Sequence, residues 1–272
     1  MVYAKTDWHA EIGRLSEMLA HEVNRVATSK PILSDRQKGH INAVLGSNDP
    51  RDHLFNIARL PDELIYVTLQ AAGGCVHNMG LLVAAGHASL TPLASLARTA
   101  FENAATAMHI VKVADPVLRT LVAADFMVKG FRDSRMGLPG QPFEKDLAAY
   151  QALVQKARRE KVNGFAKWPN RTALVEKHFA DGVSGGIYRE LSEYTHPNAV
   201  TSMFVSVAAD VNPLHNYVLS FRVVARASMA IAMAAASVSD LRERNKDQVV
   251  QFMGYILELE QQLERSLGLS KG

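Results

Sequence analysis

The chain has a single cysteine in 272 residues, and this scarcity excludes a disulfide framework and a thiolate metal cluster. Cys75 lies between Gly74 and Val76 in an apolar stretch, so we predict a buried, unreactive thiol. Ten histidines are present, but no two lie three or four residues apart and none forms His-Glu-x-x-His. The sequence therefore predicts neither a metal nor another cofactor.

Linkers, targeting signals and a dominant charge are also lacking. No Ser/Gly/Pro-rich or low-complexity run divides the chain, which predicts a single domain. The N-terminus lacks the basic-then-apolar pattern of a secretion signal, and the alanine-rich stretch 227–238 is too short for a membrane span. We therefore expect a cytoplasmic protein without membrane contact. Thirty basic against 27 acidic residues permit nucleic acid as a partner without indicating it.

The period-two alternation of strands is absent except for an ambiguous β-leaning run at 201–207. Helical periodicity dominates instead, and it predicts an all-α, single-domain multi-helix bundle with long central antiparallel helices. We expect an N-terminal helical extension over 1–50, a core bundle over 60–243 and a C-terminal docking helix over 246–267. The predicted helices are 7–28, 34–46, 61–86, 92–113, 116–135, 143–161, 171–179, 185–195, 213–243 and 246–267.

Helix starts are marked by capping residues. Thr91, Asp115 and Asn212 each precede a proline at the first helical position, and Ser34 with Gln37 forms a capping box. Each of these signals satisfies backbone N–H groups that have no partner within the helix. They therefore fix four of the predicted boundaries.

Three helices, 61–86, 92–113 and 213–243, are apolar around much of their circumference, which predicts central positions. Gly73, Gly74 and Gly80 within the first then predict close approach of neighbouring backbones. The last helix differs, since it has one apolar stripe and a Glu/Gln-rich remainder. That stripe predicts docking on the chain's own bundle or on a second subunit, since an exposed stripe of this length would invite aggregation.

Arg98 and Glu102 lie four residues apart on a helix that is otherwise built from small and apolar residues. Neither charge is easily left unpaired there, so a mutual ion pair is expected. His109 lies seven residues beyond Glu102 and extends the same stripe. In one interpretation the three residues line a polar crevice inside the bundle, and in the other the Arg98–Glu102 pair only fixes helix register.

The richest segment for chemistry is the short polar helix from Tyr188 to His196. Tyr188, Ser192 and His196 are spaced by four, and Arg189 lies seven residues before His196, so these side chains share one helical face. Pro197 places His196 at the helix end, where it can exchange protons near neutral pH. Arginine and histidine together suffice to cleave RNA through its own 2′-hydroxyl. The structural alternative is a histidine that caps the helix C-terminus beside an exposed arginine.

Two weaker signals flank this segment. Gly185 and Gly186 precede a helix and could favour an anion, but such pairs are common. A run of basic residues lies upstream and could follow a phosphate backbone or form a solvated face. Its members are Lys156, Arg158, Arg159, Lys161, Lys167, Arg171 and Lys177.

These residues carry a resemblance. The chain resembles a group of bacterial helical proteins whose pattern is a helix with Arg98-x-x-x-Glu102 followed by a helix with Tyr188-x-x-Leu191-Ser192-x-x-x-His196. More loosely, it resembles HEPN-like domains, and the resemblance covers roughly residues 60–240. Many HEPN-like domains are ribonucleases or toxins with Arg-x(4–6)-His, which Arg189 and His196 match in spacing. HEPN ribonucleases usually carry Asn, Asp or His after the arginine, whereas this chain has Glu190.

The resemblance implies a metal-independent ribonuclease, or a degenerate relative, in a toxin or phage-defence setting. Arg189 would bind phosphate and His196 would act as general acid and base. Arg98, Glu102, Tyr188, Ser192 and His109 would support them. RNA is then a possible partner, and because HEPN-like domains commonly pair, the resemblance also implies a homodimer through the C-terminal helix 246–267. The alternatives are a non-catalytic helical interaction module and a small-molecule-binding helical bundle.

Overall fold

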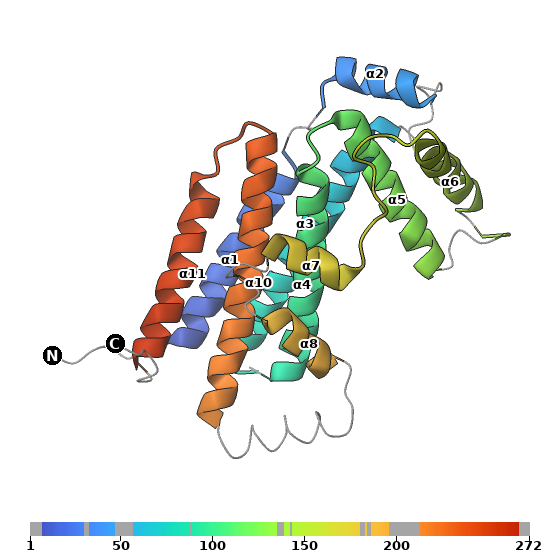
Figure 1. The fold of residues 1–272 in the computed structure, drawn as a ribbon. Coiled ribbons are helices and arrows are strands. Elements are labelled where there is room, and N and C mark those ends of the chain that lie inside the picture. Colours follow the sequence, from blue (N-terminus) through green and yellow to red (C-terminus); the bar gives the residue numbers. More distant parts are fainter. Residues whose placement is uncertain are drawn as a thin grey trace. The chain divides into compact units, whose positions relative to one another are not determined.

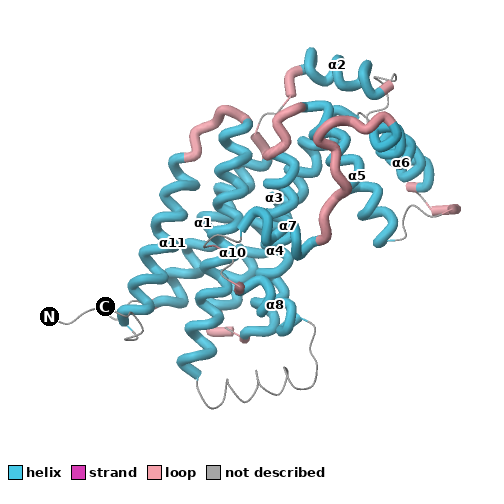
Figure 2. Tube along the Cα trace, in the orientation of Figure 1, coloured by secondary structure: helices cyan, strands magenta, loops and turns pink. Residues whose placement is uncertain are grey.

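The computed structural model describes residues 7–29, 33–46, 57–87, 89–134, 139–141, 143–179, 183, 186–195 and 213–266. Within these ranges the chain is all-α, with ten α-helices, one short 3-10 helix and no strand (Figure 2). The predicted fold class is therefore confirmed. The β-leaning run 201–207 lies outside the described residues.

The predicted helix boundaries hold to within about two residues at most ends. The helices are α1 (Trp8–Ala27), α2 (Asp35–Leu45), η1 (Ile57–Arg59), α3 (Leu60–Ala84), α4 (Leu90–Val111), α5 (Pro116–Ser134), α6 (Glu144–Arg159), α7 (Arg171–Phe179), α8 (Ile187–Thr195), α10 (Pro213–Leu241) and α11 (Asp247–Ser266) (Figure 1). Ser34 and Gln37 form the predicted capping box, and Asp115 Oδ1 accepts the Leu118 N–H at 2.7 Å. Thr91 is not a cap, because α4 already begins at Leu90. Asn212 lies outside the described residues.

The chain divides into two compact units to which α3 and α4 both contribute. The first comprises Met1–Ser29, Thr68–Met108 and Arg171–Gly272, and the second comprises Lys30–Val67 and His109–Asn170. Each unit has its own buried apolar side chains. The expectation of a single domain stays a prediction.

In the first unit, α10 is the central helix, as its composition predicts. Ala227, Ala230, Ile231, Ala234 and Val238 are all fully buried. Helices α1 and α11 pack against α10 and against each other, and the short connection after Leu241 makes α10 and α11 antiparallel (Figure 1). The buried alanines let neighbouring helices approach α10 closely on several sides.

The apolar stripe of α11 packs within its own chain. Val249, Phe252, Ile256 and Leu263 are buried, and α11 contacts α1 and α10. Two ion pairs tie the same helices, Arg226 to Glu260 at 2.9 Å and Arg222 to Glu264 at 2.8 Å. The stripe therefore needs no second subunit to cover it, and dimerisation through α11 stays a prediction that concerns its outer face.

Close helix approach explains two of the three glycines in α3. A Cβ on Gly80 would stand 2.4 Å from the Cβ of Ser16, and one on Gly73 would stand 3.3 Å from Val23, both on α1. Only glycine fits Gly80 without a shift of one helix. The prediction for Gly74 is wrong, because a Cβ there would meet nothing within 4 Å.

The second unit is organised around α5. Helix α6 packs along α5, while α2 contacts both α5 and η1. Leu33, Ile41 and Ala58 form a small buried cluster beneath α2. Arg119 is buried and donates to the carbonyls of Val113 and Ala114, so it holds the connection between α4 and α5.

Two helical segments are long and apolar enough to cross a membrane by length and composition alone, Ile57–Ala84 and Tyr217–Leu241. Half of the most apolar stretch of the first is buried in the structure, and 78% of that of the second. The core helix of a folded domain has the same character, and α10 is such a helix. The absence of membrane contact and the cytoplasmic location stay predictions.

Candidate functional site

The candidate site lies in the first unit, where the short helix α8 meets α4 and α7. Tyr188 and Leu191 are the buried residues of α8. The Tyr188 ring meets Phe101 of α4 edge-on at 6.1 Å between centroids, and Phe101 meets Phe179 of α7 in the same way at 6.0 Å. A nine-residue helix is marginal alone, so these aromatic contacts supply much of what holds α8 in place.

The Glu102 carboxylate collects hydrogen bonds from three helices. Its Oε1 accepts from Arg98 Nε at 3.0 Å and from the Tyr188 hydroxyl at 2.9 Å. Its Oε2 accepts from Arg171 Nη1 at 3.1 Å. We call Glu102, Arg98, Tyr188 and Arg171 the Glu102 network, and it joins α4, α7 and α8 through one anionic centre.

Arg98 extends this network to the C-terminal end of α8. Its Nη1 donates to Thr195 Oγ1 at 2.9 Å, and the Thr195 hydroxyl in turn donates to the Ser192 carbonyl at 3.2 Å. The guanidinium carbon also lies 5.9 Å from the centroid of the Tyr188 ring, within range of a cation–π contact. Arg98 therefore anchors the last residue of α8 to α4.

Burial shapes the electrostatics of the network. Burial and the neighbouring Glu102 charge raise the pKa of Tyr188 to about 12, so its hydroxyl stays a donor at neutral pH. Burial alone would lower the pKa of Arg98, but the hydrogen bond to Glu102 and the negative charge nearby outweigh it and the pKa is raised. The Glu102 carboxylate is thus surrounded by one neutral donor, the Tyr188 hydroxyl, and by two cations, Arg98 and Arg171.

The structure confirms the predicted pairing of Arg98 with Glu102 and adds Tyr188 to it. The Ser192 hydroxyl donates to the Tyr188 carbonyl at 3.3 Å, so it serves its own helix backbone. His109 belongs to the second unit, where its ring meets Trp168 edge-on at 4.9 Å. His196, the predicted acid–base residue, lies outside the described residues, directly after Thr195 in the chain.

Arg189, the predicted phosphate ligand, is bonded to Glu176 and not to the members of the Glu102 network. Its Nε and Nη2 both donate to Glu176 Oε1 of α7, at 2.8 and 2.6 Å. The Arg189 side chain is 77% exposed, which makes this a surface ion pair. The cation is therefore available to an anion that displaces Glu176.

Two members of the site were not expected there from the sequence. Arg171 lies 69 residues from Glu102, so no helical spacing could link them. Thr195 follows Tyr188 by seven residues and so shares its helical face, which was an available signal. Its small neutral side chain gave no reason to expect a guanidinium partner.

Among the described residues, no group of three or more His, Cys, Asp or Glu side chains is placed to hold a metal ion. Cys75 is buried, and that burial raises the pKa of its thiol, as expected for an unreactive cysteine. The network contains only one carboxylate, and donors occupy both of its oxygens. The chemistry open to it is therefore charge stabilisation and positioning.

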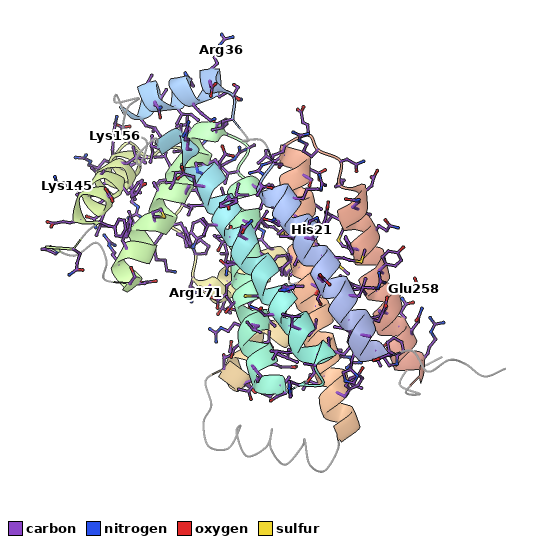
Figure 3. All side chains as sticks on the ribbon, turned by 180° about the vertical axis from the view of Figure 1, so that it is seen from behind. His21, Arg36, Lys145, Lys156, Arg171 and Glu258 are labelled. Carbon is purple, nitrogen blue, oxygen red and sulfur yellow. The ribbon has the colours of Figure 1, made fainter. Side chains whose placement is uncertain are left out.

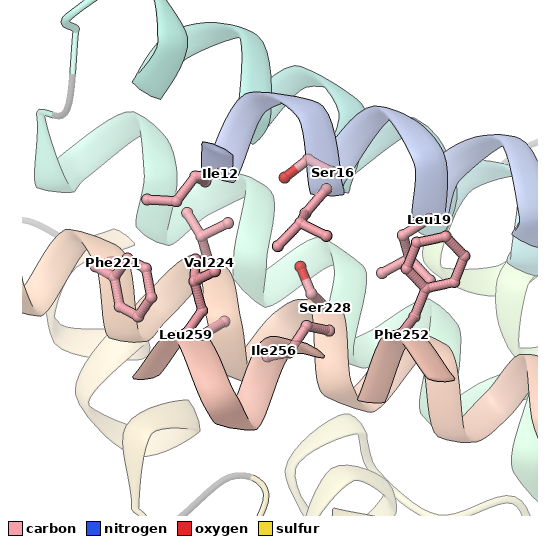
Figure 4. Close-up of a pocket in the computed structure, with 11 residues that line it drawn as sticks. Ile12, Ser16, Leu19, Phe221, Val224, Ser228, Phe252, Ile256 and Leu259 are labelled. Carbon is pink, nitrogen blue, oxygen red and sulfur yellow. The ribbon is translucent and has the colours of Figure 1, made fainter. Parts of the chain in front are cut away.

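Hollows also lie elsewhere among the described residues of the first unit. An apolar cavity of about 30 Å³ among α1, α10 and α11 is lined by Leu19, Val224 and Ile256, among others (Figure 4). It has room for one or two waters, whereas a benzene-sized ligand needs about 150 Å³. A polar groove of about 640 Å³ between α1 and α11 is lined by residues that include His21 and Tyr255. A small organic ligand would fit the groove and not the cavity.

Comparison of the chain with family models, with curated proteins and with solved structures finds no match. The chemistry of the site itself must therefore carry any statement about function.

Proposed function

We propose that the protein is a HEPN-like, metal-independent endoribonuclease, or a degenerate relative that still binds RNA, acting in a toxin or phage-defence setting. One observation carries this proposal: Arg98 clamps Thr195, the residue immediately before His196, onto the Glu102 network. Arg98 thereby fixes Thr195, the residue from which the chain continues into His196. Misplacing a catalytic group by about 1 Å can cost on the order of 10²-fold in rate.

The chemistry requires few groups. A base removes the proton of the RNA 2′-hydroxyl, the 2′-oxygen bonds to phosphorus, and the bond from phosphorus to the 5′-oxygen breaks as that oxygen takes up a proton. His196 would transfer these protons, and a guanidinium would stabilise the charged phosphorane. The products are a 2′,3′-cyclic phosphate and a 5′-hydroxyl. No metal ion takes part in these steps.

Two exposed guanidinium groups are available for the phosphate. Arg189 on α8 and Arg171 on α7 have side chains that are 77% and 67% exposed. The Arg189 pair with Glu176 is worth about 0–1 kcal/mol at such exposure, so an RNA phosphate can replace that carboxylate. Arg171 also holds Glu102, which couples the phosphate-binding surface to the network.

Incubation of the purified protein with single-stranded RNA in excess chelator tests the proposal. Cleavage should persist in chelator, His196→Ala should abolish it, and Arg189→Ala should weaken it strongly. Arg14→Ala is a matched control, because Arg14 is an exposed arginine paired with a glutamate of its own helix, on α1. Intact RNA at every accessible pH would refute the enzymatic proposal.

The non-catalytic interaction module is the second candidate, and the saturation of the network favours it. Both oxygens of Glu102 and two nitrogens of Arg98 are already bonded within the chain. Glu190, directly after Arg189, is exposed and would repel phosphate. If RNA is neither cleaved nor bound, the network is a structural device and this candidate takes the place of the first.

A further inference from the structure

The C-terminal end of α6 and the segment that follows it carry a cluster of exposed cations in the second unit. Lys156, Arg159, Lys161 and Lys167 are all exposed, and Figure 3 shows Lys156 extending outward from α6. Across this stretch of the chain Glu160 is the only acidic residue. Within the described part of the chain, none of these four cations takes part in an ion pair. We call them the α6 basic patch.

A buried carboxylate fixes the geometry of this patch. Asp125 of α5 accepts from Arg158 Nη2 at 2.8 Å and from the Trp168 backbone N–H at 2.7 Å. It therefore ties the last turn of α6 to the far end of the following loop, and Lys167 precedes the tied residue directly. Trp168 is itself buried against Phe126, with ring centroids 4.7 Å apart. Arg158 is used in this anchor, so it is not counted with the patch.

The turn after α6 carries a lysine, Lys161, at a position where the backbone is strained for any residue other than glycine. Its φ of 50° is in the left-handed region, and the Val162 N–H bonds to the Ala157 carbonyl at 3.1 Å, as in a Schellman motif. Glycine is the favoured residue at this position because it adopts that conformation freely. The chain carries lysine there instead, and strain of this kind is often retained where a side chain has a function.

We propose that the α6 basic patch binds the phosphodiester backbone of single-stranded RNA, an inference that rests on the proposed function and assigns an RNA-binding surface to the second unit. Four cations outweigh the partial negative charge of about half an electron at the end of α6. Trp168, which directly follows Lys167, is buried and so offers no stacking platform for bases, and the half-buried Phe165 is the one other aromatic residue between Lys156 and Trp168. Because lysine and arginine contact phosphates and not base edges here, we expect binding that is independent of sequence and strongly dependent on salt.

Fluorescence anisotropy with a labelled single-stranded DNA of about 20 nucleotides is the test, because DNA lacks the 2′-hydroxyl and stays intact during the measurement. Four phosphate contacts predict a slope of log affinity against log salt of about −2.8. Lys156→Glu combined with Arg159→Glu should weaken binding by about tenfold or more at about 50 mM salt and reduce the slope to about −1.4. Lys145→Glu is the matched control, since this exposed lysine of α6 stands between Glu144 and Asp146.

Lys161→Gly separates binding from folding. Glycine relieves the backbone strain, so this variant should unfold at a higher temperature while its salt slope falls by about 0.7. Absence of DNA binding by the wild-type protein, or equal binding by the double variant and Lys145→Glu, would overturn the inference. If the protein cleaves RNA and the double variant binds DNA as tightly as the wild type, this inference fails while the proposed function stands. If the protein binds DNA in a salt-dependent way but does not cleave RNA, the enzymatic proposal fails while this inference stands.

Discussion

Removal of the Glu102 carboxylate tests whether its network holds α8 on α4. In Glu102→Ala, three donors lose their acceptor: Arg98 Nε at 3.0 Å, the Tyr188 hydroxyl at 2.9 Å and Arg171 Nη1 at 3.1 Å. Tyr188 is 2% exposed, so its hydroxyl has little access to replacement water. The substitution therefore strands a buried donor and a partly buried cation, which is more costly than the loss of a surface contact.

The magnitude follows from the exposure of each partner. The Arg171 side chain is 67% exposed, so its bond contributes about 0–1 kcal/mol. The bonds from Arg98 and Tyr188 to a charged acceptor contribute about 1.5–3 kcal/mol each. The Arg98 side chain remains 22% exposed and is partly hydrated after the substitution, so the full sum is not lost. We expect a loss of about 3 kcal/mol, which lowers Tm by about 6–12 °C in a chain of this size.

Thermal and denaturant unfolding measure this loss, and hydrogen exchange locates it. Amides of α8 should exchange faster in Glu102→Ala, while those of α10 and α11 change least. Glu176→Ala is the matched control, since Glu176 also receives an arginine but lies at the surface, and it should change stability by about 0–1 kcal/mol. Equal stability of Glu102→Ala and Glu176→Ala would refute the reasoning.

Three further predictions concern the rest of the molecule. Gly80→Ala should destabilise the protein strongly, because a Cβ there would stand 2.4 Å from a side-chain carbon of α1. Gly74→Ala, whose Cβ would meet nothing within 4 Å, should stabilise it by about 0.5–1 kcal/mol, and coinciding unfolding curves of the two variants would contradict this. The pKa of Tyr188 is raised in the folded state to about 12, so the stability that its neutral hydroxyl contributes should be complete below about pH 10 and be lost as the pH rises toward 12. Ultraviolet titration of the protein and of Tyr188→Phe locates this ionisation, and a Tyr188 that ionises near pH 10 in the folded protein would oppose the prediction. If the protein dimerises through α11, the contact uses the exposed side chains Val250 and Leu257, and substituting both by glutamate should yield monomers in light scattering; an unchanged mass would remove α11 from the interface.

The helices and the central role of α10 could be predicted because both depend on local sequence. Capping at Ser34 and Asp115 and the all-round apolar composition of α10 act within a few residues, and the structure agrees with them. Gly74 shows the limit of this reasoning. Composition indicates that a helix approaches a neighbour closely, but the rotation of the helix decides which glycine faces the contact.

The candidate site was predictable only where its members share a helix. The pairing of Arg98 with Glu102 follows from their one-turn spacing. Arg171 joins them from a different helix, and its part is set by the packing of α7 and α8 on α4, which no local pattern encodes. The same packing gives Arg189 a carboxylate partner, Glu176, in the position where the sequence suggested a free phosphate ligand.

Analysis of the RNA ends after cleavage in excess chelator tests the central claim most directly. If His196 and the arginines of α7 and α8 cleave RNA through its 2′-hydroxyl, the wild-type products must carry a 2′,3′-cyclic phosphate and a 5′-hydroxyl. His196→Ala, with an unchanged melting curve, must give none, and an RNA blocked at its 2′-oxygens must stay intact. Cleavage that chelator abolishes, products with other ends, or intact RNA with the wild-type protein would contradict the claim.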